Sequence, residues 1–230
     1  MQPTKIEVLF EDNHLIAVNK PSGVLVQGDK TGDKPLSEAV KEYLIKKYNK
    51  TGEAYLGVPH RIDRPTSGLV LFAKTSKALV RLNAMFQGKE IQKTYWAVVQ
   101  GVPKPENGKL VHFLLRNPQK NKSLAYTNEV KDSKRAELNY RLLLKLNHYA
   151  LLEVAPITGR HHQIRSQLSA IGCPIKGDVK YGFNRTNKDA SIHLHARAVE
   201  LVHPVKKEKL KIIAPPPIKD PVWKVCMQDQ

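Results

Sequence analysis

His60-Arg61-Ile62-Asp63-Arg64-Pro65-Thr66-Ser67-Gly68, followed at once by Leu69-Val70-Leu71-Phe72-Ala73, is the stretch from which the fold can be worked outward. Pro65 disfavours a helical conformation for the residue before it and removes a backbone donor. Residues 60–68 should therefore form a loop that leads into a buried strand over residues 69–73. Gly68 permits backbone conformations that other residues avoid, or the close approach of a ligand.

The charges in this loop make it a candidate functional site. Asp63 is one carboxylate among several basic groups, and Arg61 and Arg64 on either side favour its ionised form. Exposed loops on a rigid scaffold often carry function. On spacing alone, however, an ordinary ion-paired turn is the simpler interpretation.

The composition points to a polyanionic partner. The 230 residues include 38 Lys and Arg against 21 Asp and Glu, a formal net charge of +17. Such an excess favours nucleic acid or an anionic membrane surface, because each neutralised phosphate releases counterions. The sequence has no apolar run of transmembrane length and no lipidation motif, so we expect RNA or DNA rather than a membrane. Two distant cysteines, Cys173 and Cys226, and no signal-peptide core indicate a cytoplasmic protein without disulfides.

The remaining chain alternates strand and helix patterns with hairpins outnumbering β-α-β units. Period-two or β-branched runs predict strands over residues 6–10, 15–18, 93–99, 110–115, 136–146, 149–155, 194–204 and 210–217. Apolar residues at helical spacing predict helices over residues 36–48 and 75–88 and around 164–171. Residues 117–134 are expected to form a loop or a ragged hairpin. This mixture indicates an α+β fold with a mixed, largely antiparallel central sheet and flanking helices.

The loop at His60 resembles the H-R-[LI]-D-x-x-T-S-G signature of RluA-type RNA pseudouridine synthases. Further resemblances follow in the family's order, roughly over residues 6–217: residues 11–23 (E-D-x-x-[LI]-x-[VA]-x-K-P-x-G), 93–97 (K-x-Y-x-A), 159–165 (G-R-x-H-Q-I-R), 175–182 and 194–217. The resemblance implies two subdomains around a basic cleft, and residues 1–230 as a single catalytic domain without an N-terminal RNA-binding module.

By this resemblance the chain isomerises specific uridines of ribosomal or transfer RNA to pseudouridine, as a monomer and without a cofactor. Asp63 would be the catalytic carboxylate, acting as nucleophile at ribose C1′ or as base at C2′. Arg165 would lie beside it, and Tyr95 would lie against the target base. A tyrosine half-buried in a sheet is the alternative interpretation of Tyr95.

Six polar side chains are candidate contacts to RNA or substrate: Lys20, Arg61, Arg64, Arg160, His162 and Gln163. Arg61 is the candidate to fill the space left by an extruded uridine, with a phosphate or structural contact as the alternative. Lys20 could equally be a solvated lysine before a turn. Where the family often has Thr and [VA]-H, this chain has His161 and Ser166-Gln167, which puts the nearby substrate contacts in question.

Histidine pairs raise a metal alternative that we do not favour. His161 and His162, if helical, would point about 100° apart rather than share a face. His193 and His195 share one strand face, but no third ligand is placed by the sequence. No metal is therefore predicted.

Two other functions compete with the synthase. A non-enzymatic RNA-binding protein would use the same basic surface without needing Asp63. A retaining glycosidase needs two carboxylates about 5–5.5 Å apart, for which Asp178 is the rival candidate, although the glycines and Tyr181 around it suggest a structural turn.

Overall fold

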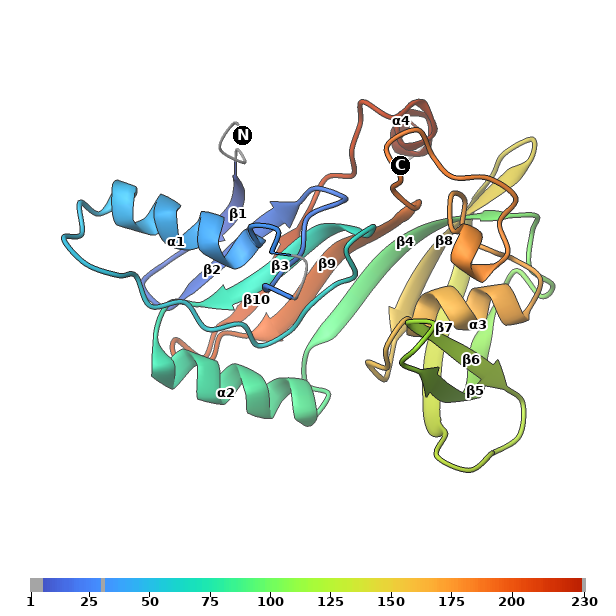
Figure 1. Cartoon of the computed structure of the whole chain (residues 1–230), viewed down its shortest axis with the longest axis horizontal. Coiled ribbons are helices and arrows are strands. Elements are labelled where there is room, and N and C mark those ends of the chain that lie inside the picture. The colour runs from blue at the N-terminus through green and yellow to red at the C-terminus, as the bar shows by residue number, and fades with distance from the viewer. Residues whose placement is uncertain (1–5, 30–31, 229–230) are drawn as a thin grey trace. The chain divides into compact units, whose positions relative to one another are not determined.

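The computed structural model describes residues 6–29 and 32–228, and the chain divides into two compact units. Unit 1 comprises the residues up to Gln92 together with Ala196–Pro217, and unit 2 comprises Lys93–His195 and the residues from Ile218. Each unit combines antiparallel strands with helices (Figure 1). The predicted α+β class with a largely antiparallel sheet is confirmed.

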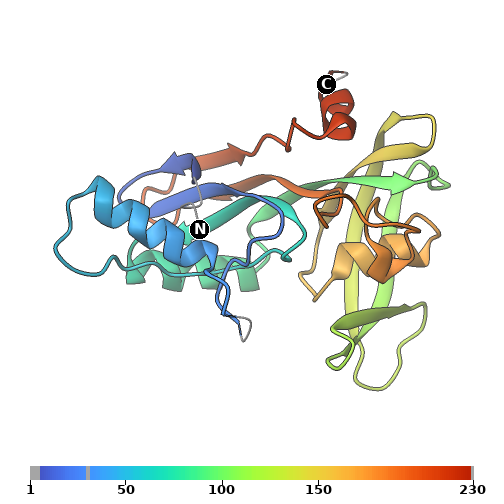
Figure 2. The ribbon, with the colours of Figure 1, turned by 45° about the horizontal axis from the view of Figure 1, so that its top comes forward.

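Unit 1 is built on a sheet that carries the predicted N-terminal hairpin. β1 (Glu7–Glu11) pairs antiparallel with β2 (Leu15–Lys20), and β2 pairs antiparallel with β3 (Ser67–Ala73). β9 (Leu194–Val202) follows β3 in the sheet, and β10 (Lys209–Ile213) pairs antiparallel with β9. Figure 2 shows the deep-blue β1 beside the red β10. Every residue of β3 is buried, as the apolar run predicted.

Two helices complete unit 1, α1 (Leu36–Lys47) and α2 (Ser76–Gln87), and both lie within one residue of their predicted bounds. The Thr75 side chain caps α2 by accepting the Ala78 N–H at 3.3 Å, which stabilises a helix by about 1 kcal/mol. Leu82 and Met85 face a core that includes Leu71 of β3. The apolar residues whose spacing predicted this helix therefore form its buried face.

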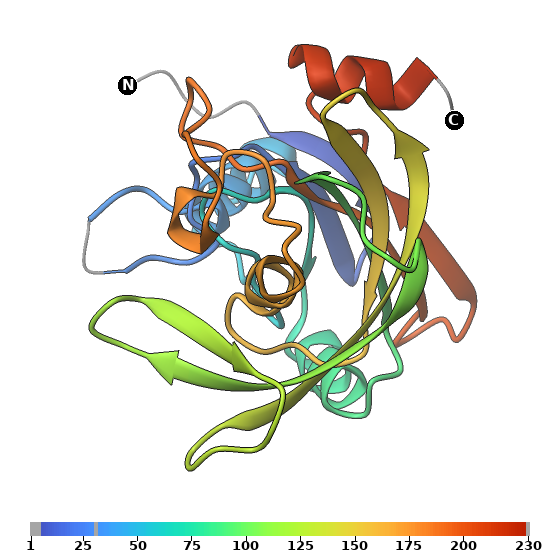
Figure 3. The same cartoon turned by 90° about the vertical axis from the view of Figure 1, so that its right-hand side faces the viewer.

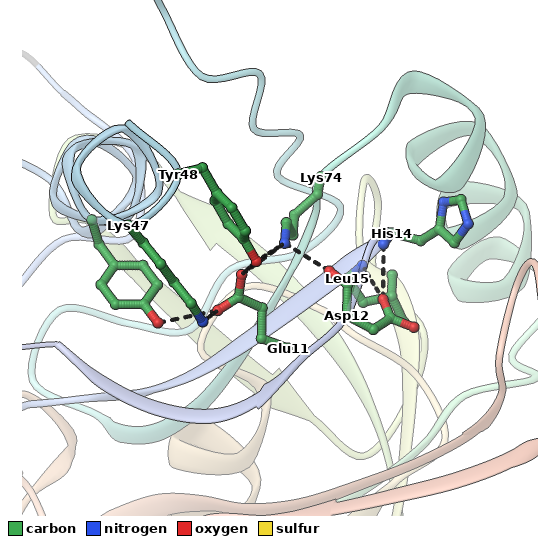
Figure 4. Close-up of polar contacts among 8 residues, drawn as sticks. Glu11, Asp12, His14, Leu15, Lys47, Tyr48 and Lys74 are labelled. Carbon is green, nitrogen blue, oxygen red and sulfur yellow. Dashed lines mark hydrogen bonds and ion pairs between the residues drawn. The ribbon is translucent and has the colours of Figure 1, made fainter. Parts of the chain in front are cut away.

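A carboxylate at the end of β1 ties α1 to the hairpin (Figure 4). Oε1 of Glu11 accepts the Lys74 ammonium at 2.7 Å and the Tyr48 hydroxyl at 2.6 Å, and Oε2 accepts Lys47 at 2.7 Å and Tyr43 at 3.1 Å. Burial alone would raise the pKa of Glu11, but these hydrogen bonds outweigh it and lower the pKa to about 2. Glu11, the first residue of the family-like segment 11–23, thus fixes the local structure of unit 1.

Unit 2 holds an antiparallel sheet in the order β4 (Gln92–Gln100), β8 (Tyr149–Pro156), β7 (Lys134–Lys145), β5 (Asn107–Asn117) and β6 (Lys122–Tyr126). The polar segment 117–134 contains β6, so its hairpin interpretation holds. Alternation along β7 stops at Leu143, and the pairing of β7 with β8 shifts register between Leu142 and Leu144. The break in the sequence pattern therefore marks a β-bulge.

The two faces of β4 support different helices. Ala97 and Val99 face a core with Leu168 of α3 (Gln163–Ala170), around which the strands curve (Figure 3). Trp96 and Val98 face the opposite way, toward a cluster containing Trp223 of α4 (Pro221–Gln228). α4 was not predicted, although Asp220 before Pro221 is a helix-start signal. Its Oδ1 accepts the N–H groups of the next two non-proline residues. Among the helices in the described residues, none is long and apolar enough to cross a membrane.

Candidate active site

The loop that carries Asp63 lies in unit 1 and has the predicted form. The Thr66 N–H donates to the Asp63 carbonyl at 3.1 Å, which closes a turn around Arg64 and Pro65. The Asp63 side chain is partly exposed. Gly68 has φ +113°, and a Cβ there would overlap the backbone of Ala196 on β9. Glycine is thus required by the close approach of a neighbouring strand, which explains its place in the motif without a ligand.

His60 anchors the start of the loop. Its Nε2 accepts the Leu71 N–H of β3 at 2.9 Å, so the neutral ring carries its proton on Nδ1. The ring also stacks on Phe86 of α2, with centroids 4.8 Å apart. His60 therefore fixes the loop against both a strand and a helix.

Lys20, at the end of β2, supports the same loop from the protein interior. Its side chain is 0% exposed, and its ammonium donates to the carbonyls of Pro21 at 3.0 Å, Val24 at 2.8 Å and Arg64 at 3.1 Å. The three acceptors match the three N–H donors of an ammonium. Direct contact with RNA, and the alternative of a solvated lysine, are both wrong for this residue, because the group is buried and fully used.

The charge of Lys20 is coupled to the candidate catalytic residue. Burial lowers the pKa of Lys20 to about 7, the nearby Asp63 carboxylate opposes this, and the positive charge of Arg64 adds to it. Lys20 therefore supports the backbone of the Asp63 loop, and its ammonium lies close enough to feel the Asp63 carboxylate.

The two arginines of the loop differ in their surroundings. The Arg64 side chain donates from Nε to the Gly23 carbonyl at 2.9 Å and pairs with Asp33 at 2.7 Å, while the Gly23 N–H donates to the Arg64 carbonyl at 2.8 Å. Arg64 thus joins the turn after β2 to the Asp63 loop. Arg61 is exposed, and its predicted contact with RNA stays a prediction, as does that of the exposed Arg64 guanidinium.

Unit 2 carries the other two residues predicted to be catalytic. Tyr95 of β4 is half-buried opposite Val154 of β8, on the face toward α3. Arg165 of α3 is 4% exposed and makes a bidentate pair with Asp178, from Nε at 2.7 Å and from Nη2 at 2.9 Å. Its guanidinium carbon also lies 5.0 Å from the centre of the Tyr181 ring.

The Arg165–Asp178 pair is a site feature that sequence reasoning missed. Asp178 is 1% exposed and precedes the short 3-10 helix Val179–Tyr181, so the structural turn expected there is present. Both oxygens of Asp178 are occupied by Arg165, and the planar guanidinium is oriented by them. The signal available in the sequence was that both residues lie in segments resembling the same family.

The turn before α3 is held by Gln163. Its Oε1 accepts the Thr158 hydroxyl at 2.7 Å and the Arg160 N–H at 3.0 Å, and its Nε2 donates to the Glu137 carbonyl at 2.9 Å. Gln163 is 4% exposed and its amide supports the turn, and its contact with substrate stays a prediction. Arg160 is exposed, with Nε donating to the Arg135 carbonyl at 3.2 Å, and its contact with RNA stays a prediction.

The two adjacent histidines lie in the turn before α3 and not in the helix. His162 precedes α3 in a left-handed conformation with φ 52°, and its ring stacks on His161 with centroids 3.8 Å apart. His162 is 9% exposed and its Nδ1 is 2.9 Å from the Tyr181 hydroxyl. Burial, then the charge of Arg165, lowers the pKa of His162 to about 2. A ring that stays neutral at ordinary pH supports the turn, and its predicted contact with substrate remains a prediction.

The departures from the family pattern have interior roles. His161 Nδ1 is 3.0 Å from the Ser123 hydroxyl and its Nε2 is 3.1 Å from Asn121 Oδ1, which ties α3 to the β5–β6 hairpin. Ser166 and Gln167 are buried, and Gln167 Nε2 donates to the carbonyls of neighbouring strands. Ser166 and Gln167 therefore help to pack unit 2, whereas the partly exposed His161 links the turn to the hairpin.

His193, which immediately precedes β9, is also engaged within unit 2. His193 has Nε2 3.0 Å from Asp220 Oδ1 and Nδ1 3.0 Å from Asn187 Nδ2. Both ring nitrogens of His193 therefore have hydrogen-bond partners within the protein, which accounts for this histidine without a metal ion. Over residues 6–29 and 32–228, no three His, Cys, Asp or Glu side chains group as metal ligands would.

Comparison with known proteins gives a consistent set of matches. The ribosomal large subunit pseudouridine synthase C of Vibrio cholerae is 35% identical over 214 residues, which are 90% of this chain and 65% of the relative. The tRNA pseudouridine synthase C of Pectobacterium carotovorum is 32% identical over 93% of this chain and 60% of its own length. The chain thus spans less than two thirds of these two relatives. The ribosomal large subunit pseudouridine synthase D of Zymomonas mobilis is 33% identical, covering 94% of this chain and 71% of that protein.

Solved structures have the same fold. Human RNA pseudouridylate synthase domain containing 4 superposes with a TM-score of 0.74 at 25% identity, over 90% of this chain and 87% of that one. Human RNA pseudouridylate synthase domain containing 1 gives a TM-score of 0.75 at 19% identity, over 98% and 89% of the two chains. The family model for RNA pseudouridylate synthase matches residues 14–170, a span that includes the Asp63 loop, Tyr95 and Arg165. The chain belongs to the RNA pseudouridylate synthase family.

Proposed function

We propose that this chain isomerises specific uridines of ribosomal or transfer RNA to pseudouridine, with Asp63 as the catalytic carboxylate. Membership of the family supports the reaction, and the names of the relatives support the two classes of RNA. The observation that carries the proposal is the construction of the Asp63 loop. Lys20, His60 and Arg64 hold the backbone around one partly exposed acid, as a site that must present a group in one geometry requires.

The chemistry needs only the residues of this chain. The bond from ribose C1′ to uracil N1 breaks, the base turns, a bond forms from C1′ to C5, and the C5 proton is lost as N1 gains one. Asp63 acts either as the nucleophile at C1′ or as the base at C2′. Because reactant and product have the same composition, no cofactor is consumed.

Two residues of unit 2 complete the proposed catalytic set. Tyr95 offers a ring face on which the detached uracil stacks, which favours a base without requiring a sequence. Arg165, oriented by Asp178, supplies a guanidinium beside the Asp63 carboxylate during the reaction. A bidentate pair on one side leaves a guanidinium with further N–H donors.

The RNA would be held by positive side chains at the surface. The exposed Arg61, Arg64 and Arg160 are suited to phosphates, and Arg61 next to Asp63 would occupy the space of the extruded uridine. We further propose that residues 1–230 act as one catalytic domain, as a monomer in the cytoplasm.

Substitution of Asp63 by Asn tests the proposal. RNA from cells that lack the gene is incubated with wild-type protein or the variant, and pseudouridines are mapped by carbodiimide modification. We expect product only with the wild type, and equal RNA binding by both, because Asn keeps the size of the side chain and removes the nucleophile or base. Product formed by the variant at the wild-type rate would favour an RNA-binding protein without catalysis by Asp63.

A further inference from the structure

Lys93 stands beside the proposed base-stacking residue on the same strand. Side chains of β4 alternate, so Lys93 and Tyr95 point to one face, that of α3. Two residues along a strand correspond to roughly 6.6 Å. One bound nucleotide can therefore touch both side chains.

The surroundings of Lys93 differ from those of a structural lysine. The ammonium nitrogen would lie 3.7 Å from a Cβ at Gly159, in the exposed turn that leads to α3. Lys93 is half-buried, and burial lowers the pKa of its ammonium, with no charged neighbour contributing. In the part of the chain that the structure describes, it makes no hydrogen bond or ion pair. Lys20, by contrast, satisfies all three donors with carbonyls.

A partly buried ammonium without an acceptor from the protein is held at some cost to its hydration. The cost is recovered if a ligand supplies the acceptor, and the absence of a side chain at Gly159 leaves room for one next to the ammonium. Lysine is a compact point charge with three donors, which suits a phosphate. The neighbouring Arg160 is exposed and adds positive charge to the same turn.

We propose that Lys93 binds the phosphate of the nucleotide whose base stacks on Tyr95. Together with the Gly159 turn it forms a phosphate subsite on unit 2. The inference rests on the proposed function, because it assumes that Tyr95 holds the target uracil. Lys93 is thus a substrate-positioning residue, and the bond-making groups lie elsewhere.

Binding of two small probes separates this role from others. Uridine and uridine 5′-monophosphate are titrated into the isotope-labelled protein, and each Kd is measured from NMR shift changes. The wild type should bind the monophosphate about tenfold more tightly, as expected for hydrogen bonds to a charged group. Lys93→Gln should bind both probes equally and leave the Kd for uridine unchanged, whereas Lys93→Arg should keep the preference.

Lys224→Gln is the matched control. It removes the same charge from the exposed surface of α4, which packs on the opposite face of β4. This variant should retain the tenfold preference. With RNA from cells that lack the gene, Lys93→Gln should raise KM about tenfold and leave kcat unchanged, while Lys224→Gln should match the wild type.

Several outcomes would overturn the subsite. If Lys93→Gln weakens the binding of uridine and of uridine 5′-monophosphate equally, Lys93 contacts the nucleoside and not the phosphate. If the variant keeps the tenfold preference for the monophosphate, Lys93 has only a packing role. Loss of the folded NMR spectrum in both Lys93 variants would assign it to the core. The binding result does not depend on catalysis by Asp63. If the wild-type protein prefers the monophosphate through Lys93 but forms no pseudouridine, the phosphate subsite is supported and the proposed function is refuted.

Discussion

Replacing Glu11 by Gln should destabilise the protein in a way that depends strongly on pH. The side chain is 7% exposed and its two oxygens accept four hydrogen bonds, two of them from the ammonium groups of Lys47 and Lys74. A glutamine keeps one acceptor oxygen and turns an N–H donor toward groups that are themselves donors. The cluster therefore loses its charge and its geometry together.

The size of the effect follows from the pKa of Glu11, which falls from 4.5 to about 2 in the folded protein. Each pKa unit corresponds to 1.36 kcal/mol, so the ionised carboxylate contributes about 3 kcal/mol to the free energy of unfolding. Because the folded pKa is depressed, this stability is fully present above pH 4.5 and is lost as the pH falls toward 2.

Urea denaturation at several pH values measures this difference. We expect Glu11→Gln to be about 3 kcal/mol less stable than the wild type at pH 7, with the gap closing toward pH 2. Glu42→Gln is the control, because the Glu42–Lys34 pair is 59% and 49% exposed and surface pairs contribute little. A gap that is absent at pH 7, or that persists unchanged at pH 2, would refute the reasoning.

Three further substitutions test the supports of the candidate site. Lys20→Met should cost about 2–4 kcal/mol, because it leaves buried carbonyls without a donor, and should lower turnover although Lys20 is not exposed; chemical denaturation and pseudouridine mapping measure both, and unchanged stability would contradict the role. Arg165→Met should abolish turnover with a modest change in RNA affinity, as checked by mapping and filter binding, and full turnover would remove its assigned role. Tyr95→Ala should slow the reaction at saturating RNA while Tyr95→Phe retains the stacking ring and binds RNA normally; an unaffected rate in the alanine variant would return Tyr95 to the core.

Local patterns were sufficient for most elements of the fold. The spacing of Ala78, Leu82 and Met85 predicted α2 and its buried face, and the loss of alternation at Leu143 coincides with the bulge in β7. Such features depend on residues close in sequence, which a pattern can report. α4 has only eight residues and follows the proline run that ends at Pro217, so its start signal at Asp220 is short and isolated.

The roles of polar side chains were less predictable, because they depend on partners far away in the chain. Lys20 looked like a surface residue, yet one of its acceptors, the Arg64 carbonyl, is 44 residues away. Arg165 was expected beside Asp63, which stays a prediction, and the structure pairs it with a different acid, Asp178. His162 adopts φ 52° immediately before α3 begins, a conformation that the helical spacing around residues 164–171 does not indicate. None of these pairings has a signature in local periodicity.

Unit 1 is assembled from two distant parts of the chain, residues up to Gln92 and Ala196–Pro217. The strand that carries Gly68 has β9 as a neighbour, and that neighbour is made more than a hundred residues later. While the polypeptide is being synthesised, the segment around Asp63 therefore has to wait for nearly the whole chain before its sheet can close. Truncated forms that stop before β9 should therefore leave β3 without its neighbour at Gly68, whereas the contacts of Lys20, His60 and Arg64 that hold the Asp63 loop are made within the first part of the chain.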